Sequence, residues 1–441
     1  MKTLHIGNIA NNAYLASFKE REVGIDAHCI SPNFLQVMGF PEWEHLSFVR
    51  ARELEFYKSK NERTAVDPDW FHTGTWREIF NSFGINDFSH SLLSRKVSFF
   101  SRLFDFLWIN HRETVKRLVP VPLRAFIVGT VLQGIREIFF ESDKFKLVIN
   151  SFDFVTLYGP YVSLAKYFEG KDYIAFEHGT LRDFINAPYA LSRGTKRGFK
   201  GAKVVICTNQ DSYKIAQDLE LQNIYASPHP IIDGDAREIQ NIRSKNLEQD
   251  LDHFRVLVPA RHTIPLNIDV GKGSHLIYQA IIQYLNENEK VIFDLVTWGD
   301  NVRHAKNELR DLENIGKVVW HDLMSRPLLS EKILRANVVI DQLMIPAYGG
   351  ITSDALRLGT PVITRHDCKL DEDFFGSCAP VFSATKPSEV IDQLDHLLNK
   401  SKLEKARHSS SSSKWFIENM SSEVSLQKRL SAYMDLGGSK S

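Results

Sequence analysis

The residues best suited to chemistry lie in the segment 348–364, which follows an apolar run typical of a buried strand. The adjacent glycines Gly349 and Gly350 predict a tight turn whose backbone N–H groups approach an anion closely. A short helix follows, and its N-terminus adds partial positive charge. Asp354, a few residues into that helix, is placed to accept hydrogen bonds from sugar hydroxyls. The pattern indicates a site for a nucleotide diphosphate and its ribose.

A second segment carries two cations in a similar setting. The apolar run 256–259 predicts a strand that delivers Arg261 to its carboxyl end, and Lys272 stands between two glycines just before a helix. A planar guanidinium and a compact ammonium together suit a diphosphate. The alternative is an ordinary surface arginine and a loop lysine. Because Arg261 and Lys272 both lie at the ends of predicted elements, the other alternative, that they converge on one site, stays open.

The composition restricts the class of protein. At 441 residues the chain exceeds what one ordinary core supports, which predicts two domains. Basic and acidic residues balance at 54 each, which argues against a general nucleic-acid binder. No secretory signal and no long uncharged apolar run stands out. We therefore expect a cytoplasmic protein without a membrane span, with peripheral contact at the inner face of a membrane left open.

The four cysteines, Cys29, Cys207, Cys368 and Cys378, lie far apart and form no C-x-x-C pair. We expect reduced thiols in an intracellular protein, with neither a zinc site nor a disulfide framework. Asp-x-Asp pairs occur at 67/69, 233/235 and 371/373. Such pairs hold metal ions in a different, single-domain transferase fold, and none follows a convincing first-domain strand. We interpret them as turns and predict no metal and no cofactor.

Short apolar runs alternate with amphipathic segments, which predicts an α/β fold of two doubly wound domains that face a cleft. A polar stretch at 235–253 separates two series of strands. We therefore expect a first domain at 1–235, a second at 236–412 and, after the serine tract 409–413, a final amphipathic helix within 413–441. The expected strands are Thr3–Gly7, Leu147–Asn150, Tyr173–Glu177, Val204–Thr208 and Ile224–Ser227, then Phe254–Pro259, Val291–Trp298, Lys317–Trp320, Val338–Gln342, Pro361–Thr364 and Pro380–Phe382.

Residues 43–140 differ from the rest of the first domain, being aromatic and without a clear strand rhythm at their start. From 91 to 140 there are eight basic residues against three acidic ones, interleaved with aromatic residues. A basic amphipathic helix of this kind can lie on an anionic membrane surface. The commoner arrangement is a pair of helices packed on the sheet with their cations in water.

The carboxy-terminal half resembles the donor domain of retaining GT-B glycosyltransferases of the family 4 type. That family has a strand ending in Arg, a Lys-Gly loop, a Leu-rich region before a buried strand, a glycine loop and a Glu-Ala-x-x-x-Gly-x-Pro-Val-Ile segment. This chain has Arg261, Lys272-Gly273, the region 321–343, Tyr-Gly-Gly at 348–350 and Asp-Ala-Leu-Arg-Leu-Gly-Thr-Pro-Val-Ile at 354–363. The resemblance implies a GT-B fold of two Rossmann-like domains with a carboxy-terminal crossover helix.

The resemblance also implies roles. Arg261 and Lys272 would grip the donor diphosphate, and Asp354 would hold the ribose. The backbone N–H groups of the two glycines and of Ile351 would meet the phosphate or the transferred sugar. This chain departs from the family at two acidic positions. The family usually has two glutamates with seven residues between them. The second position is Asp354, and the first is Pro346, which has no acceptor for the donor sugar.

The amino-terminal half matches the family more loosely. The loop with Gly7, Asn8 and Asn11 follows the first strand, where the family has a small-residue loop near the acceptor. His178 ends a strand as a histidine does in the family's acceptor domain, where it would contact the transferred sugar or the acceptor hydroxyl. A lone histidine is more often structural. Glu177 should point to the opposite face of the strand, so we assign it no role.

By this resemblance the chain is expected to be a glycosyltransferase. It would move a sugar from a nucleotide-diphosphate sugar to a glycan or lipid-linked acceptor, with retention and without metal. Two alternatives remain. One is a GT-B nucleotide-sugar epimerase, which the missing acid at Pro346 disfavours. The other is a catalytically silent sugar-binding or scaffold protein, which the same proline and the altered segment 229–233 leave open.

Overall fold

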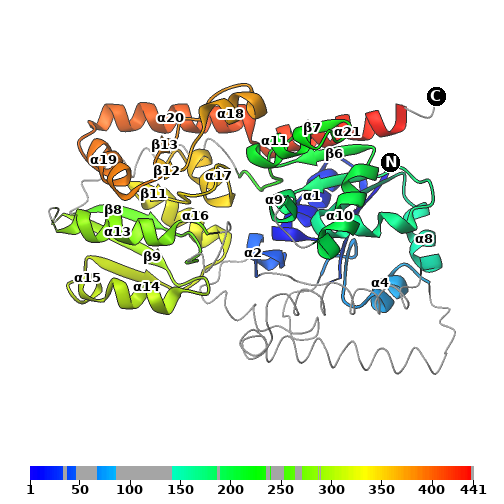
Figure 1. The fold of residues 1–441 in the computed structure, drawn as a ribbon, viewed down its shortest axis with the longest axis horizontal. Coiled ribbons are helices and arrows are strands. Elements are labelled where there is room, and N and C mark those ends of the chain that lie inside the picture. Colours follow the sequence, from blue (N-terminus) through cyan, green and yellow to red (C-terminus); the bar gives the residue numbers. More distant parts are fainter. Residues whose placement is uncertain are drawn as a thin grey trace.

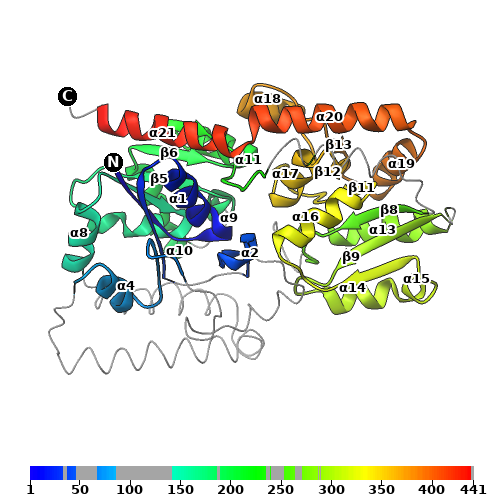
Figure 2. The same cartoon turned by 180° about the vertical axis from the view of Figure 1, so that it is seen from behind.

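The computed structural model describes residues 1–32, 37–45, 67–85, 142–185, 189–234, 239, 253–263, 271–286, 288 and 290–438. Two α/β domains lie side by side along the longest axis of the molecule (Figure 1). The view from behind shows two consecutive helices, α20 and α21, running along one edge of both domains (Figure 2). The two-domain α/β architecture predicted from the alternating pattern is confirmed.

The first domain is built on seven parallel strands among the described residues, in the order β3-β2-β1-β4-β5-β6-β7. Four of the five residues of β1 are buried, because helices cover both faces of the sheet. This double coverage explains the apolar runs in the sequence. The strands are β1 (Lys2–Ile6), β2 (Asp26–Ser31), β3 (Phe71–Thr73), β4 (Phe154–Tyr158), β5 (Ile174–Glu177), β6 (Val204–Cys207) and β7 (Ile224–Ala226).

Two hydrophobic clusters cover the faces of this sheet. One contains residues of α4, α8, η5 and α10, and the other contains residues of α1 and the last helix, α21. The helices of the domain are α1 (Asn12–Glu22), α2 (Glu42–His45), α4 (Trp76–Ser82), α8 (Ser142–Asn150), α9 (Thr180–Ile185), α10 (Tyr189–Gly201) and α11 (Gln210–Asp218), with 3-10 turns η1 (Ile9–Asn11), η2 (Val37–Gly39) and η5 (Gly159–Tyr167).

The second domain has six parallel strands among its described residues, in the order β10-β9-β8-β11-β12-β13. The strands are β8 (Phe254–Val258), β9 (Val291–Val296), β10 (Val318–His321), β11 (Val338–Ile340), β12 (Val362–Thr364) and β13 (Phe382–Ser383). The helices are α13 (Ser274–Leu285), α14 (Val302–Glu308), α15 (Arg310–Asn314), α16 (Arg326–Arg335), α17 (Gly350–Arg357), α18 (Cys368–Phe375) and α19 (Pro387–Leu398).

The chain then crosses back to the first domain through α20 (Lys402–Asn419) and α21 (Ser422–Gly438). The expected break at the serine tract is wrong, because residues 409–413 lie inside α20. Small side chains are needed there. Ser409 lies against Gly359 at the end of α17, and Ser413 Oγ donates to the Arg357 carbonyl (3.2 Å). The tract is a packing surface rather than a linker.

The predicted strand Leu147–Asn150 is also wrong, since these residues end helix α8. Phe145, Val148 and Ile149 are buried and Leu147 is 62% exposed, which is the spacing of a helix face. Asp371 and Asp373, expected in a turn, lie inside α18 instead. Asp371 is buried and accepts the Ala379 N–H (2.9 Å).

The expectation of four reduced thiols is wrong for the two cysteines of the second domain. Cys368 and Cys378 form a disulfide, with a Cα–Cα distance of 5.0 Å. Cys368 begins α18 and Cys378 follows its end, so the short helix brings two cysteines together that are 10 residues apart. Cys29 and Cys207 are free thiols buried in the first domain.

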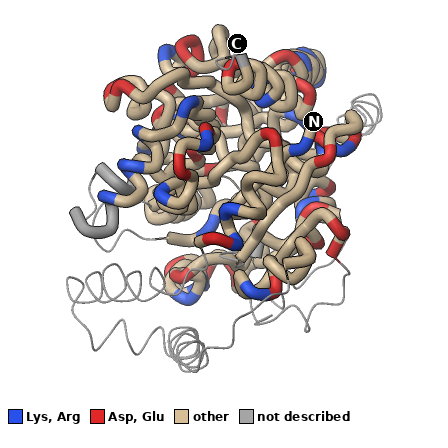
Figure 3. Tube along the Cα trace, turned by 90° about the vertical axis from the view of Figure 1, so that its right-hand side faces the viewer, with Lys and Arg blue, Asp and Glu red and all other residues tan. Residues whose placement is uncertain are grey.

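The segment 91–140 lies outside the described residues, as does most of the insert predicted at 43–140. The membrane-surface hypothesis for this segment therefore stays a prediction, as does the domain boundary at 235. Figure 3 looks onto the end of the molecule formed by the first domain. Basic and acidic residues are interspersed along the described chain there, in keeping with the balanced composition.

Candidate functional site

The two segments singled out in the second domain meet at the carboxyl edge of its sheet. The strand order reverses between β8 and β11, which are paired neighbours. β8 leads into Arg261, and β11 leads into the loop that ends at Gly349. Open parallel sheets bind ligands in the crevice beyond the strand ends at such a reversal. Arg261 and the glycine turn therefore flank the position where this topology favours a ligand.

The backbone at Arg261 is tied to the turn that carries Lys272. Ser274 Oγ donates to the Arg261 carbonyl (3.3 Å) and accepts the Thr263 N–H (3.2 Å). Thr263 Oγ1 in turn accepts the Lys272 N–H (3.2 Å). Arg261 Nε is buried and has no hydrogen-bond partner within the described part of the chain. A buried N–H without a partner is costly, so this guanidinium is suited to an anion that would supply the missing acceptor.

Lys272 reaches the predicted glycine turn. Its Nζ lies 3.8 Å from the position that a Cβ on Gly349 would occupy, and 3.4 Å from the buried Asp341 Oδ1. Thr352 Oγ1 donates to the other Asp341 oxygen (2.8 Å), which fixes this carboxylate beneath the turn. Helix α17 begins at Gly350, and no side chain among the described residues caps its first N–H groups. The lysine ammonium and the helix N-terminus thus form one positive site.

Asp354 lies one turn inside α17, is buried, and already has partners. Arg326 donates to both of its oxygens, from Nε to Oδ2 (3.1 Å) and from Nη2 to Oδ1 (3.2 Å). Arg357 Nη2 also donates to Oδ1 (3.1 Å). The carboxylate predicted to hold the ribose therefore anchors two arginines in this structure.

Arg326 was not predicted, and it links the two domains. Its Nη1 donates to Glu44 Oε2 on α2 (3.2 Å). Burial alone would lower the pKa of Arg326, but the carboxylates of Asp354 and Glu44 raise it above the usual value for arginine. Arg326 is the first residue of α16, so its side chain leaves the helix start toward the first domain. Its sequence context gives no signal of this contact.

The predicted acceptor-side residues of the first domain hold the segment that carries α2. Asn8 Nδ2 donates to the Gly39 carbonyl (2.9 Å), and Asn11 Nδ2 donates to the Phe40 carbonyl (2.8 Å). Gly7 has a φ of +96°, and a Cβ there would lie 2.2 Å from the Tyr161 ring, so only glycine fits. The loop lies at the carboxyl end of β1, but the amide donors of Asn8 and Asn11 are used within the protein.

His178 lies at the carboxyl end of β5, as predicted. Its Nδ1 is 3.4 Å from Thr208 Oγ1, at the end of the neighbouring β6. Burial, with a smaller contribution from the Arg182 charge, lowers the pKa of His178 to about 4. The imidazole is therefore neutral at pH 7. Glu177 points into the core, where its Oε1 accepts the Leu181 N–H (3.0 Å).

His229 is a second histidine that the sequence did not single out for a role. Its ring packs edge-on against His178, with the ring centroids 4.6 Å apart. Its two nitrogens each lie 3.3 Å from an amide oxygen, of Asn12 and of Asn209. His229 also lies against the backbone of Tyr348, the residue before Gly349. It thus connects His178 of the first domain with the glycine turn of the second.

A buried polar cluster fixes the domains nearby. Gln210 at the start of α11 donates from Nε2 to Asp371 Oδ1 on α18 (2.9 Å), and its Oε1 accepts the Tyr348 N–H (3.4 Å). The Tyr348 hydroxyl donates to Asp371 Oδ2 (2.7 Å). Gln210 was missed because its two partners are more than 100 positions away, and no local spacing reveals such a pair.

Comparisons with known proteins agree with this arrangement of domains. No protein-family model and no curated protein matches the chain. Among solved structures, it is similar to HepE of Anabaena in complex with UDP and glucose, with a TM-score of 0.60 and 13% identity over 98% of this chain and 99% of that one. Sucrose-phosphate synthase of Thermosynechococcus elongatus gives a TM-score of 0.58 and 9% identity over 100% of both chains. A glycosyltransferase of Rickettsia africae gives 0.55 and 12% over 99% and 98%.

The chain has the GT-B fold. The likeness spans both domains and the crossover helices, so the predicted GT-B architecture is confirmed. Identities of 9–13% show the fold alone. The resemblance to the family 4 type and the roles that it implies for individual residues stay predictions.

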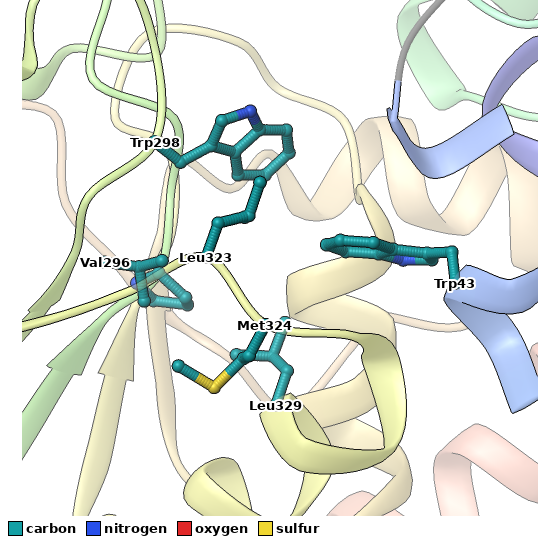
Figure 4. Close-up of a pocket in the computed structure, with 7 residues that line it drawn as sticks. Trp43, Val296, Trp298, Leu323, Met324 and Leu329 are labelled. Atoms are coloured by element: carbon teal, nitrogen blue, oxygen red, sulfur yellow. The ribbon is translucent and has the colours of Figure 1, made fainter. Parts of the chain in front are cut away.

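An apolar pocket lies between the two GT-B domains. It is lined on one side by Trp43 of α2 and on the other by residues of the second domain (Figure 4). Trp298 follows the end of β9, and its ring centroid lies 6.4 Å from that of Trp43. Pro259 follows β8 and places the pocket beside the strand end that leads to Arg261. The remaining lining residues are Val296, Leu323, Met324 and Leu329.

None of the helices that the structure describes is both long and apolar enough to cross a membrane.

Proposed function

We propose that this chain is a glycosyltransferase that moves a sugar from a nucleotide-diphosphate sugar to a glycan or lipid-linked acceptor. The proposal includes retention of anomeric configuration and a reaction without metal. The observation that carries it is the cluster of Lys272, the uncapped start of α17 and Arg261 around the strand-order reversal of a GT-B domain. These groups offer positive charge and free N–H donors to one anion.

In this proposal the donor diphosphate binds between Arg261 and Gly349. The Arg261 guanidinium, the Lys272 ammonium and the N–H groups of Gly350 and Ile351 donate to its oxygens. Negative charge grows on the leaving diphosphate as the glycosidic bond breaks, so these donors bind the transition state more tightly than the ground state. Lys272 would exchange part of its interaction with Asp341 for the phosphate. Cationic side chains and backbone dipoles take the place of a metal ion.

The nucleoside is assigned to the pocket between Trp43 and Trp298, whose volume of about 10 Å³ holds roughly one water molecule, so that the domains must move apart to admit a base. Its apolar lining suits a planar base, and it lies beside the same strand ends as the diphosphate site. Ribose binding by Asp354 requires one of its oxygens to exchange an arginine N–H for a sugar hydroxyl. Because Arg326 also pairs with Glu44, this exchange would loosen one contact between the domains.

The acceptor is assigned to the first domain, where His178 would face the transferred sugar. A neutral imidazole both donates and accepts one hydrogen bond, and the low pKa of His178 keeps it neutral at pH 7. His229 packs against the ring of His178 and contacts the backbone of Tyr348, so it would link the acceptor side to the donor side. Closure of the cleft would exclude water that otherwise hydrolyses the donor.

The test is nucleotide release from UDP-, GDP- and ADP-sugars with a panel of simple glycosides as acceptors. UDP-sugars come first, because HepE has been solved with UDP-glucose. We expect turnover with one nucleotide class in the presence of a chelator, a product with the donor's anomeric configuration by NMR, and a loss of at least about 100-fold in Arg261→Ala. Arg335→Ala, an exposed arginine at the far end of α16, is the control. No release from any donor, or equal rates in Arg261→Ala, would show that the proposal is wrong.

A further inference from the structure

We propose that His366, Cys368 and Cys378 form a site for one soft divalent metal ion, such as zinc, once the Cys368–Cys378 disulfide is reduced. The site lies beside α18 in the second domain. It shares no residue with the Arg261 and Lys272 site, although the His366 ring stacks on Tyr348 beside the glycine turn. The proposal does not depend on glycosyl transfer. It departs from the sequence-based expectation that the cysteines form no zinc site.

The geometry of the three donor atoms carries the inference. One ligand atom of each residue lies within 4.8 Å of the other two. His366 Nε2 is 3.5 Å from Cys378 Sγ. Zinc binds thiolate sulfur at about 2.3 Å and imidazole nitrogen at about 2.0–2.1 Å, and a tetrahedral angle then separates the two ligand atoms by about 3.5 Å. The imidazole is therefore already at the ligand-to-ligand distance of a zinc centre.

The surrounding backbone fixes these side chains. Asp367 caps α18 by accepting the Lys369 N–H (3.0 Å), which holds Cys368 at the first position of the helix. The Ser383 hydroxyl donates to the His366 carbonyl (3.3 Å). Gly376 ends the helix with a φ of +81°, and the chain turns back to Cys378. A preorganised set of two sulfurs and one nitrogen binds metal more readily than three flexible side chains.

The chemistry of the donors selects the ion. Two thiolates and one imidazole favour zinc over magnesium or calcium, which prefer oxygen ligands. Three protein ligands leave the fourth tetrahedral position for a water molecule. Asp371 Oδ2 lies 3.0 Å from His366 Nε2, so metal binding must displace this contact. When this contact is lost, Asp371 still accepts hydrogen bonds from Tyr348 and Ala379, so helix α18 keeps its position.

The disulfide and the metal are mutually exclusive. A thiol or phosphine reductant supplies two electrons to the disulfide, which takes up two protons and yields two thiols; with a phosphine, water supplies these protons and the oxygen of the phosphine oxide. Metal binding then replaces the two thiol protons, which are released to solvent. Cys368 is exposed, so both the reductant and the ion reach it from solvent. Cys29 and Cys207 are buried and lack this access.

The experiment is a cobalt titration of the whole chain after reduction with a phosphine, which is itself oxidised to the phosphine oxide. Cobalt reports thiolate ligands through a charge-transfer band in the near ultraviolet. We expect this band to saturate at one equivalent and to disappear when zinc is added. The oxidised chain should show no band. Cys368→Ser and Cys378→Ser should each weaken binding by about 100-fold or more, and Cys207→Ala should bind as the parent chain does.

The unmutated chain gives a second readout that is independent of how the variants fold. Zinc should protect Cys368 and Cys378 of the reduced chain from alkylation, as located by mass spectrometry. The proposal is overturned if the reduced chain shows no thiolate band, if both cysteines are alkylated equally with and without zinc, or if zinc binds the oxidised chain as tightly as the reduced one.

Discussion

Glu177 and His178 are neighbours in the chain, and burial shifts the pKa of each side chain toward its uncharged form. Burial raises the pKa of Glu177 to about 7, and it lowers the pKa of His178 to about 4. Their side chains leave β5 on opposite faces, because alternate residues of a strand do so. Glu177 caps the start of α9 from inside the core, and His178 remains at the sheet edge. Sequence alternation predicted this division, but it could not predict the pKa changes, which depend on the surrounding packing.

Glu177 should make stability depend on pH. Its pKa is higher in the folded chain than the usual 4.5 of the unfolded chain, so the folded state binds more protons between these values. The group therefore stabilises the fold least at high pH, and its contribution falls as pH rises from 5 to 8, by about 2–3 kcal/mol. Glu177→Gln keeps the acceptor for the Leu181 N–H and removes the titration.

The measurement is urea unfolding of the parent chain and Glu177→Gln at pH 5 and at pH 8. The variant should gain about 2–3 kcal/mol relative to the parent between these two pH values. Asp218→Asn, at the exposed end of α11, is the control and should show a small change. A difference between parent and Glu177→Gln that is the same at both pH values would contradict the account.

At the scale of elements, the strands of the second domain were predicted more accurately than those of the first. The expected strands of the second domain match β8 to β12, because each is an apolar run flanked by polar residues, and the expected strand Pro380–Phe382 overlaps β13 only at Phe382. In the first domain, β2 was missed because Asp26-Ala-His-Cys-Ile-Ser mixes polar and apolar residues, and His28 is half-buried beside Asp26 (3.1 Å). The run at 147–150 predicts a strand wrongly because four residues are too few to separate the period of a strand from that of a helix.

The serine tract shows a different limit of prediction from sequence, because the packing of helix α20 depends on Gly359, which is far away in the sequence. Gly359 has a φ of +66°, and a Cβ there would lie 2.2 Å from Ser409 Oγ and 2.8 Å from the Ser409 carbonyl oxygen. Helix α20 approaches α17 so closely that neither element tolerates a larger side chain at this crossing. Low-complexity composition alone does not reveal that contact.

Gly359→Ala should therefore destabilise the chain by about 2–4 kcal/mol, from backbone strain and overpacking together. Gly376→Ala is a matched control. Gly376 also has a positive φ (+81°), but no atom of the described residues lies within 4 Å of an added Cβ, so strain alone should cost about 1 kcal/mol. Denaturant unfolding of both variants measures the difference. Equal losses would mean that α17 and α20 are not in this close contact.

At the scale of the whole molecule, the crossover helix is held to the first domain by a buried charge cluster. Arg429 Nε of α21 donates to Glu20 Oε1 of α1 (3.0 Å), and the Tyr433 hydroxyl donates to the same oxygen (2.9 Å). Burial alone would raise the pKa of Glu20, but His5, Arg429 and Thr3 lower it to about 2. Glu20 is therefore charged, and this contribution to stability is lost only as pH falls from about 4.5 toward 2.

Arg429→Met should cost about 3–5 kcal/mol, because it removes the guanidinium that pairs with the buried Glu20 carboxylate. Glu20→Gln combined with Arg429→Met should cost clearly less than the two single changes added together. The exposed neighbour Lys428→Met should stay within about 0.5 kcal/mol of the parent. Urea unfolding of the four chains and the control gives these values. Additive single effects would show that the pair does not act as a unit.

The two GT-B domains are joined by contacts that no local pattern predicts, among them Arg326 with Glu44 and Gln210 with Asp371. The site predicted from the sequence lies at the opening between the two domains. Lys272 Nζ reaches Gly349 at the strand-order reversal, and the backbone of Arg261 is tied to the turn that carries Lys272. Asp354, Asn8 and Asn11 are near the predicted places but are engaged by protein partners, which the sequence alone does not reveal.

The central claim is that Arg261 and Lys272 hold a nucleoside diphosphate. It is tested most directly by isothermal titration calorimetry of UDP, GDP and ADP into the parent chain, Arg261→Ala, Lys272→Ala and the exposed control Arg335→Ala. We predict one site for one of these nucleotides. Each site variant should bind about 10- to 100-fold more weakly, the loss expected for one charge-assisted hydrogen bond, and the control should match the parent. Absence of binding by all three nucleotides, or unchanged affinity in both site variants, would contradict the account.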